Sequence, residues 1–166
     1  IVLGTGLGGL ADKANAEHVI EYSEIPHFPQ STVEGHDGKL IFGTINNRRV
    51  VLMKGRFHYY EGYSMQQVVF PIRVMYLLGA TNLIVSNASG GVNANFEVGD
   101  IMLIQDQINL QPENPLRGPN LDQLGPRFPD MSEPYDLRLL SIAESIAVEK
   151  KILVHKGTYA SVSGPN

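Results

Sequence analysis

Short runs of apolar, often β-branched residues alternate along this chain with stretches whose apolar positions repeat at helical spacing. The runs predict strands at residues 1–5, 19–22, 40–45, 50–53, 82–88, 101–105 and 159–163. Asn46-Asn47-Arg48, between two of these runs, indicates a hairpin turn. Strands that alternate with helices favour an α/β fold, a mixed central β-sheet flanked by helices on both faces.

The clearer of two predicted helices covers residues 65–76, where apolar side chains fall at i, i+3, i+4, i+7 and i+11. Ser64 and Gln67 form a capping-box pattern at its start, and Gly79 suits its end. Pro71 lies inside the pattern, so we expect it to bend the helix or to weaken one turn.

The C-terminal half of the chain contains the second predicted helix and a long loop. Apolar residues at helical spacing over 139–147 predict the helix. Residues 111–134 include six prolines and two glycines and have little periodicity, which predicts a surface loop. Loops of this length in compact domains are usually functional or disordered.

Composition narrows the class of protein. The chain has 166 residues, 43% of them hydrophobic and 18% charged, which predicts a single globular domain over 1–166. The net charge is −4 and no run of basic residues occurs, so we expect no nucleic-acid partner. There is no cysteine for disulfides or thiolate metal sites, and no apolar stretch approaches the roughly 18 residues of a membrane span. We therefore expect a cytoplasmic protein without a membrane partner.

Both ends of the chain fall within patterned sequence. Ile1-Val2-Leu3 already belongs to a strand-like run, and Ser163-Gly164-Pro165-Asn166 follows directly after another. We expect the domain to be truncated at both ends.

The first glycine cluster, GTGLGG at 4–9, follows a predicted strand and satisfies the dinucleotide pattern G-x-G-x-x-G. Only about ten residues separate Gly9 from the next predicted strand, which is too few for the full helix of a dinucleotide fold. Backbone N–H groups and the Thr5 hydroxyl could instead donate to an anion. A tight turn that binds nothing fits the residues equally well.

Two further clusters also follow predicted strands: GRFHYYEGY at 55–63 and SNASGG at 86–91. Arg56 can grip an oxyanion with two parallel N–H groups, and His58 can donate to the same anion. Tyr60 offers a flat ring and a hydroxyl, which suit a sugar. Each residue alone is more simply a surface or core residue, but three such clusters at strand ends favour a phosphate-sized site.

Seven motifs together resemble the trimeric type of purine nucleoside phosphorylase, over the whole of residues 1–166. They are GTGLGG, EIPHFPQSTVEGHDGKL, GRFHYYEGY, SNASGG, FEVGDIMLIQDQINL, NPLRGPN and RFPDMSEPYD. The resemblance implies a phosphorylase-type three-layer fold with its C-terminal part missing, and a homotrimer. It also implies phosphorolysis of purine nucleosides by inorganic phosphate, without a metal or an organic cofactor.

The resemblance also assigns roles to individual residues. It implies phosphate binding by Thr5, His36, Arg56, His58 and the Ala88 backbone N–H. Thr5 stands where the family usually has serine, so the hydroxyl is kept. It implies catalytic roles for His58, Glu61 and Asn87, with Glu61 orienting phosphate and the glycine-rich loop and Asn87 between phosphate and base. It places Tyr60 against the ribose and Phe128 in the sugar site of a neighbouring subunit.

Two alternatives stay open at this point. A methylthioadenosine phosphorylase shares the fold and reaction type, although GRFHYYEGY is not expected there in this form. A non-catalytic, phosphate-binding fragment is the other, because the resemblance puts the base-contacting residues beyond Asn166. Turnover by these 166 residues alone is therefore in question, and the preferred purine nucleoside is left undecided.

Overall fold

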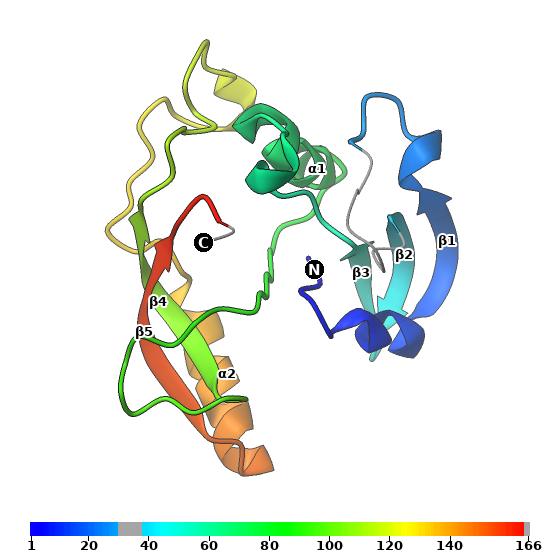
Figure 1. Cartoon of the computed structure of the whole chain (residues 1–166). Helices are drawn as coiled ribbons and strands as arrows, with labels where there is room; N and C mark the ends of the chain where they lie inside the picture. Colours follow the sequence, from blue (N-terminus) through cyan, green and yellow to red (C-terminus); the bar gives the residue numbers. More distant parts are fainter. Residues whose placement is uncertain (30–37, 165–166) are drawn as a thin grey trace. The chain divides into compact units, whose positions relative to one another are not determined.

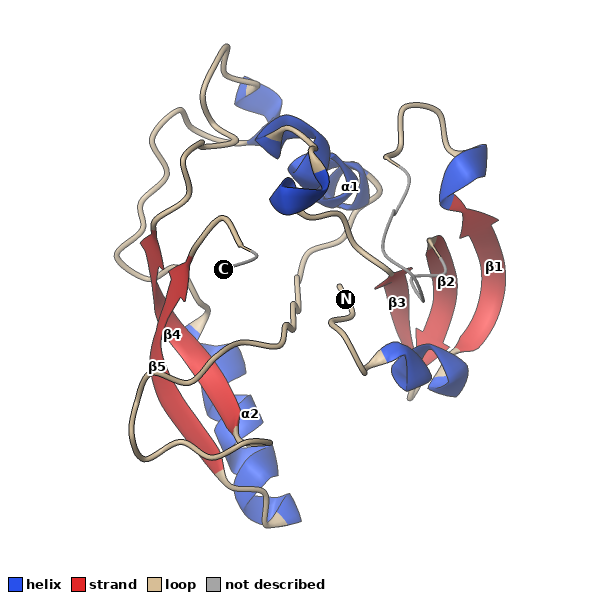
Figure 2. Cartoon of the chain, viewed as in Figure 1, coloured by secondary structure: helices blue, strands red, loops and turns tan. Residues whose placement is uncertain are grey.

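The computed structural model describes residues 1–29 and 38–164, which form two compact units, Ile1–Ser89 and Gly90–Gly164. Each unit contains its own sheet and its own α-helix (Figures 1 and 2). The expected α/β class with mixed strand directions is confirmed, since the strands are antiparallel in one sheet and parallel in the other. The single domain expected over 1–166 stays a prediction.

The N-terminal unit is built on three antiparallel strands in the order β1-β2-β3. They are β1 (Asn15–Glu21), β2 (Lys39–Ile45) and β3 (Arg48–Lys54). The predicted hairpin joins β2 to β3, with φ of +46° at Asn46 and +60° at Asn47. Two-residue hairpin turns of type I′ require such left-handed backbone at both central positions, which asparagine tolerates better than most residues.

Both faces of this sheet are covered by apolar side chains. Because neighbouring residues on a strand point to opposite faces, Leu40 and Met53 belong to one cluster while Ile41 and Leu52 belong to the other. The first cluster also contains Tyr22, Phe28 and Phe57, together with Met75 of α1 (Met65–Leu77). The second contains Leu3 and Ala11, the latter from the 3-10 helix Gly8–Lys13.

Helix α1 begins and ends as its sequence predicts. The Ser64 hydroxyl accepts from Gln67 N–H at 3.3 Å, and the Gln67 side chain accepts from Ser64 N–H at 2.9 Å. Gly79, beyond the last turn, has φ of +95°. The helix continues through Pro71 although proline has no N–H to donate. The Pro71 ring is buried.

The strands predicted at 1–5 and 82–88 are largely absent. Val2 forms only isolated parallel bridges, to Met53 and to Val85. A turn at Gly4–Leu7 ends the first segment, with Leu7 N–H donating to the Gly4 carbonyl at 3.1 Å. The other segment exposes about half of Leu83, Ile84 and Val85, so its apolar pattern does not correspond to a buried strand within this unit. The run predicted at 19–22 lies in β1, which ends one residue earlier, before the 3-10 helix Tyr22–Glu24.

The C-terminal unit pairs β4 (Ile101–Asn109) in parallel with β5 (Val154–Ser161). Helix α2 (Leu137–Lys150) connects them and runs alongside the two strands in Figure 1. The Asp136 carboxylate caps α2 by accepting from Leu139 N–H at 2.8 Å. β4 extends four residues beyond its predicted run, and β5 begins five residues before its own. These additional positions include polar residues, which the apolar pattern does not mark as strand. The predicted loop at 111–134 is confirmed and contains only the 3-10 helix Asp122–Leu124.

Leu52 is 0% exposed and belongs to the second apolar cluster, so we expect it to contribute strongly to the stability of the N-terminal unit. Leu52→Ala should lower the free energy of unfolding by about 2–5 kcal/mol, because it removes buried methyl groups and leaves a cavity. Leu77→Ala, at a leucine that is 64% exposed, is the matched control and should cost much less. Denaturant unfolding measures both, and equal losses would contradict the assigned core.

Candidate active site

Three loop segments of the N-terminal unit meet at Ser86. The Ser86 hydroxyl accepts from Gly4 N–H at 3.0 Å, and the Ser86 carbonyl accepts from Arg56 Nη1 at 2.5 Å. The structure thus brings together the first glycine cluster, the segment GRFHYYEGY and the start of the second glycine cluster, as the sequence predicted.

Gly4 is required by this close approach of two backbones. A Cβ at this position would lie 2.5 Å from the Ser86 carbonyl oxygen, so no side chain fits. The turn that follows needs φ of +81° at Gly6 and leaves Thr5 exposed. The next element is only the six-residue 3-10 helix Gly8–Lys13, so the dinucleotide interpretation does not fit.

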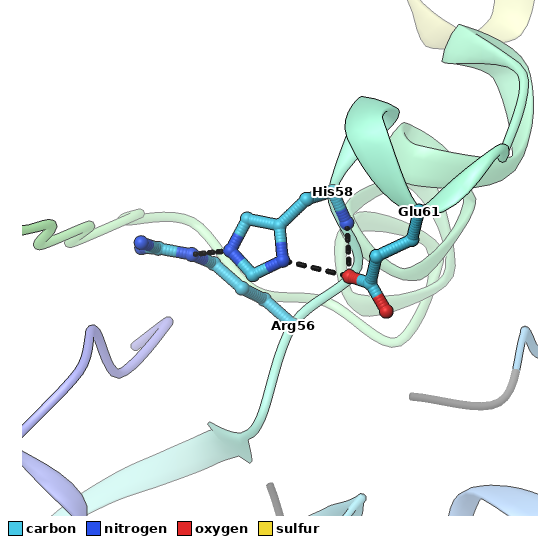
Figure 3. Close-up of polar contacts among 3 residues, drawn as sticks. All are labelled: Arg56, His58 and Glu61. Atoms are coloured by element: carbon cyan, nitrogen blue, oxygen red, sulfur yellow. Dashed lines mark hydrogen bonds and ion pairs between the residues drawn. The ribbon is translucent and has the colours of Figure 1, made fainter. Parts of the chain in front are cut away.

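Arg56, His58 and Glu61 form a hydrogen-bonded row (Figure 3). Arg56 Nε donates to His58 Nε2 at 3.0 Å, and His58 Nδ1 lies 2.7 Å from Glu61 Oε1. Because a guanidinium can only donate, Nε2 is the acceptor in this contact. Nδ1 therefore bears the ring proton and donates it in the hydrogen bond to Glu61. His58 is thereby held in one tautomer and one orientation.

The Glu61 carboxylate is buried, with its side chain 2% exposed. The same oxygen, Oε1, also accepts from the His58 backbone N–H at 2.8 Å. A buried carboxylate is tolerated only when it is hydrogen-bonded or paired, and His58 supplies both contacts. Glu61 is the last residue of the 3-10 helix Tyr59–Glu61, a short turn that brings its side chain back to His58.

The other predicted site residues are placed as follows. Tyr60 stacks on His58, with ring centroids 4.7 Å apart and an interplanar angle of 14°. Asn87 and Ala88 are exposed, directly after Ser86 in the chain. Phe128 belongs to the C-terminal unit, is 86% exposed and lies 5.9 Å from the Arg127 guanidinium. His36 falls outside the described residues.

Two residues were missed by sequence reasoning. The sequence indicates Ser86 only as part of SNASGG. Its position between an apolar run and two glycines is the one feature that points to a structural role. Tyr22 donates its hydroxyl to the Gly55 carbonyl at 2.6 Å, next to Arg56. Nothing in the sequence distinguishes Tyr22 from any other buried aromatic residue.

The chemistry of this cluster suits an oxyanion. Arg56 supplies a cation with a planar set of N–H donors, which matches phosphate and carboxylate. Among the residues the structure describes, no group of three or more His, Asp or Glu could hold a metal ion. Within the same residues, no helix has the length and apolar character needed to cross a membrane. The loops of the N-terminal unit that meet at Ser86 thus have the chemistry of an oxyanion site.

Comparison with known proteins identifies the family. Residues 1–166 match the Phosphorylase superfamily, and the chain belongs to it. It is 53% identical to purine nucleoside phosphorylase 1 of Bacillus subtilis and 52% identical to purine nucleoside phosphorylase of Bos taurus, with all of the chain aligned in both. A crystal structure of isoform 2 of purine nucleoside phosphorylase from Schistosoma mansoni, in complex with cytosine and ribose-1-phosphate, matches at a TM-score of 0.93 with 46% identity over 99% of the chain.

The chain is shorter than these relatives. It spans 61% of the Bacillus subtilis protein, 59% of the Bos taurus protein and 60% of the Schistosoma mansoni chain.

Gly4 and Gly9 provide a paired test of the contact at Ser86. Gly4→Ala should destabilise the N-terminal unit by about 1–3 kcal/mol, because the added methyl group forces the two backbones apart. Gly9→Ala adds the same group where nothing lies within 4 Å, so it should change stability little. Thermal or denaturant unfolding compares the two variants, and equal effects would show that Gly4 does not approach Ser86 as described.

Proposed function

We propose that the protein catalyses the phosphorolysis of purine ribonucleosides and deoxyribonucleosides. Inorganic phosphate is the second substrate, and the products are a free purine and a pentose 1-phosphate. The observation that carries the proposal is the fixed Arg56 guanidinium, held between Ser86 and His58 where three loops meet. Relatives named purine nucleoside phosphorylase support it, as do a purine nucleoside phosphorylase structure in complex with ribose-1-phosphate and a Schistosoma structure in complex with hypoxanthine.

The chemistry needs an anion in a defined place. A phosphate oxygen forms a bond to the anomeric carbon while the bond from that carbon to the purine nitrogen breaks. The bonding electron pair leaves with the purine, which then takes up a proton. Positive charge develops on the ribose as the bond breaks, so a phosphate fixed beside it stabilises that charge and is also the nucleophile. We propose that no metal or organic cofactor takes part.

The roles proposed for individual residues come from the resemblance, and the contacts of Arg56 and Glu61 support two of them. Arg56 binds phosphate. The resemblance assigns Thr5, His36, His58 and the Ala88 backbone N–H to the same anion, and His58 donates to it when Nε2, here the acceptor from Arg56, bears a proton. Glu61 accepts from His58 and so fixes the ring beside Arg56. Tyr60, stacked on that ring and partly exposed, contacts the ribose. Asn87 acts between the phosphate and the base.

The direct test measures two properties separately. Calorimetric titration reports phosphate binding by the 166-residue chain, and hypoxanthine release from inosine with phosphate reports phosphorolysis. We expect both in the full-length protein. Phosphate binding without release from the short chain would mean that the chain is a phosphate-binding part. Absence of both activities from the full-length protein would exclude the proposed function.

Arg56→Ala should raise the Michaelis constant for phosphate by about 10- to 150-fold, the equivalent of about 1.5–3 kcal/mol for a charge-assisted contact. The constant for the nucleoside should change far less, because the guanidinium is proposed to contact the anion. Arg49→Ala, an exposed arginine of β3, is the control and should leave both constants unchanged. An unaltered phosphate constant in Arg56→Ala would remove Arg56 from the site.

We further propose a cytoplasmic homotrimer in which Phe128 enters the sugar site of a neighbouring subunit. Its ring is 86% exposed within its own unit, as expected of a side chain that contacts another molecule. Phe128→Ala should therefore weaken nucleoside binding while phosphate binding is largely kept. Steady-state kinetics, with sedimentation for the oligomeric state, check this, and a fully active monomer would contradict it.

A further inference from the structure

Tyr22 connects two backbone segments in the core of the N-terminal unit. Its hydroxyl donates to the Gly55 carbonyl at 2.6 Å, and its backbone N–H donates to the Gly38 carbonyl at 2.7 Å. Its ring also lies against Gly38, where a Cβ would come 3.1 Å from the ring carbon Cδ2. A single residue therefore restrains the start of β2 and the end of β3.

One of the two restrained positions adjoins a residue of the proposed phosphate site. Gly55 directly precedes Arg56 and has φ of +92°, so it turns the chain sharply as it leaves β3. The orientation of the peptide between Gly55 and Arg56 depends on where the Gly55 carbonyl is held, and the Tyr22 hydroxyl donates to that carbonyl.

We propose that Tyr22 is a positioning residue for phosphate binding: its hydroxyl fixes the Gly55 carbonyl and, through it, the direction in which Arg56 leaves the sheet. This inference rests on the proposed function, because it assumes that Arg56 binds phosphate. Tyr22 itself does not contact the anion.

The surroundings of Tyr22 suit this role. Tyr22 is 1% exposed, and its ring is packed against Phe28 at 5.1 Å and Phe57 at 5.2 Å between centroids. Burial raises the pKa of the Tyr22 hydroxyl far above its usual range, so the group stays protonated and remains a donor. Removing only the hydroxyl leaves the ring packing in place but leaves the Gly55 carbonyl without this donor inside the core.

The test is Tyr22→Phe in the full-length protein, with phosphate binding and phosphorolysis measured separately. We expect the dissociation constant and the Michaelis constant for phosphate to rise roughly three- to tenfold, the range that corresponds to loss of one hydrogen bond. The Michaelis constant for the nucleoside should stay close to its original value. Steady-state kinetics, with each substrate varied while the other is saturating, and calorimetric titration of phosphate give these values.

Two control variants separate positioning from simple loss of stability. Phe28→Leu disturbs the same aromatic cluster but keeps the Tyr22 hydroxyl, so it should lower the melting temperature without changing the phosphate constants. Tyr76→Phe removes a hydroxyl from an exposed position of α1 and should change neither property. If Tyr22→Phe does not fold at the assay temperature, Gly38→Ala replaces it, because the added methyl group presses on the ring and should also raise the phosphate constants.

The outcomes are distinct. A selective rise in the phosphate constants supports the proposal. Unchanged phosphate constants in folded Tyr22→Phe or Gly38→Ala overturn it, as does an equal rise in Phe28→Leu. If the unsubstituted protein releases hypoxanthine but these variants bind phosphate normally, only the positioning role fails. If the unsubstituted protein neither binds phosphate nor releases hypoxanthine, the proposed function fails and the positioning role fails with it.

Discussion

The approach of Gly4 to Ser86 is the contact on which the arrangement of the candidate site depends. These residues are far apart in the sequence, yet the Gly4 N–H donates to the Ser86 hydroxyl and no Cβ fits between the two backbones. Ser86 then uses its carbonyl to accept from Arg56. One serine therefore satisfies donors from two other segments, and the three loops keep their relative positions because their polar groups are paired with one another.

The second constraint is the buried Glu61 carboxylate. Burying a charge is costly unless the group is paired, and here the His58 ring and the His58 backbone N–H both bond to the carboxylate. This arrangement determines which His58 nitrogen bears the proton and leaves the other to accept from Arg56. Glu61 thus helps to set the orientation of the guanidinium through His58.

Sequence patterns predicted the elements that are determined by residues close together in the chain. The asparagines of the β2–β3 hairpin and the capping box of α1 each act within a few residues, and both are found as predicted. The strands expected at 1–5 and 82–88 were largely wrong, because strand formation depends on partners that an apolar run does not reveal. Val2 finds single bridge partners in Met53 and Val85, whereas Leu83 and Ile84 are about half exposed.

The candidate site was predictable to a similar degree. Its charged and ring-bearing residues could be picked out because they follow predicted strands, where α/β proteins place their ligands. The residues that hold these side chains in place could not be predicted from the sequence. Ser86 acts through contacts with Gly4 and Arg56, and Tyr22 acts on Gly55 from 33 residues away in the sequence. Such long-range pairs become visible only when the chain is folded.

The acceptors that hold Arg56 also explain why arginine suits this position better than lysine. The Ser86 carbonyl and His58 Nε2 lie on different sides of the guanidinium and are contacted by different nitrogens, Nη1 and Nε. A planar guanidinium can span two fixed acceptors, whereas an ammonium group is a single point of charge. The Glu61 carboxylate is hydrogen-bonded to Nδ1, the ring nitrogen that does not accept from Arg56. The same planar set of N–H donors that meets these acceptors matches the geometry of a phosphate oxyanion.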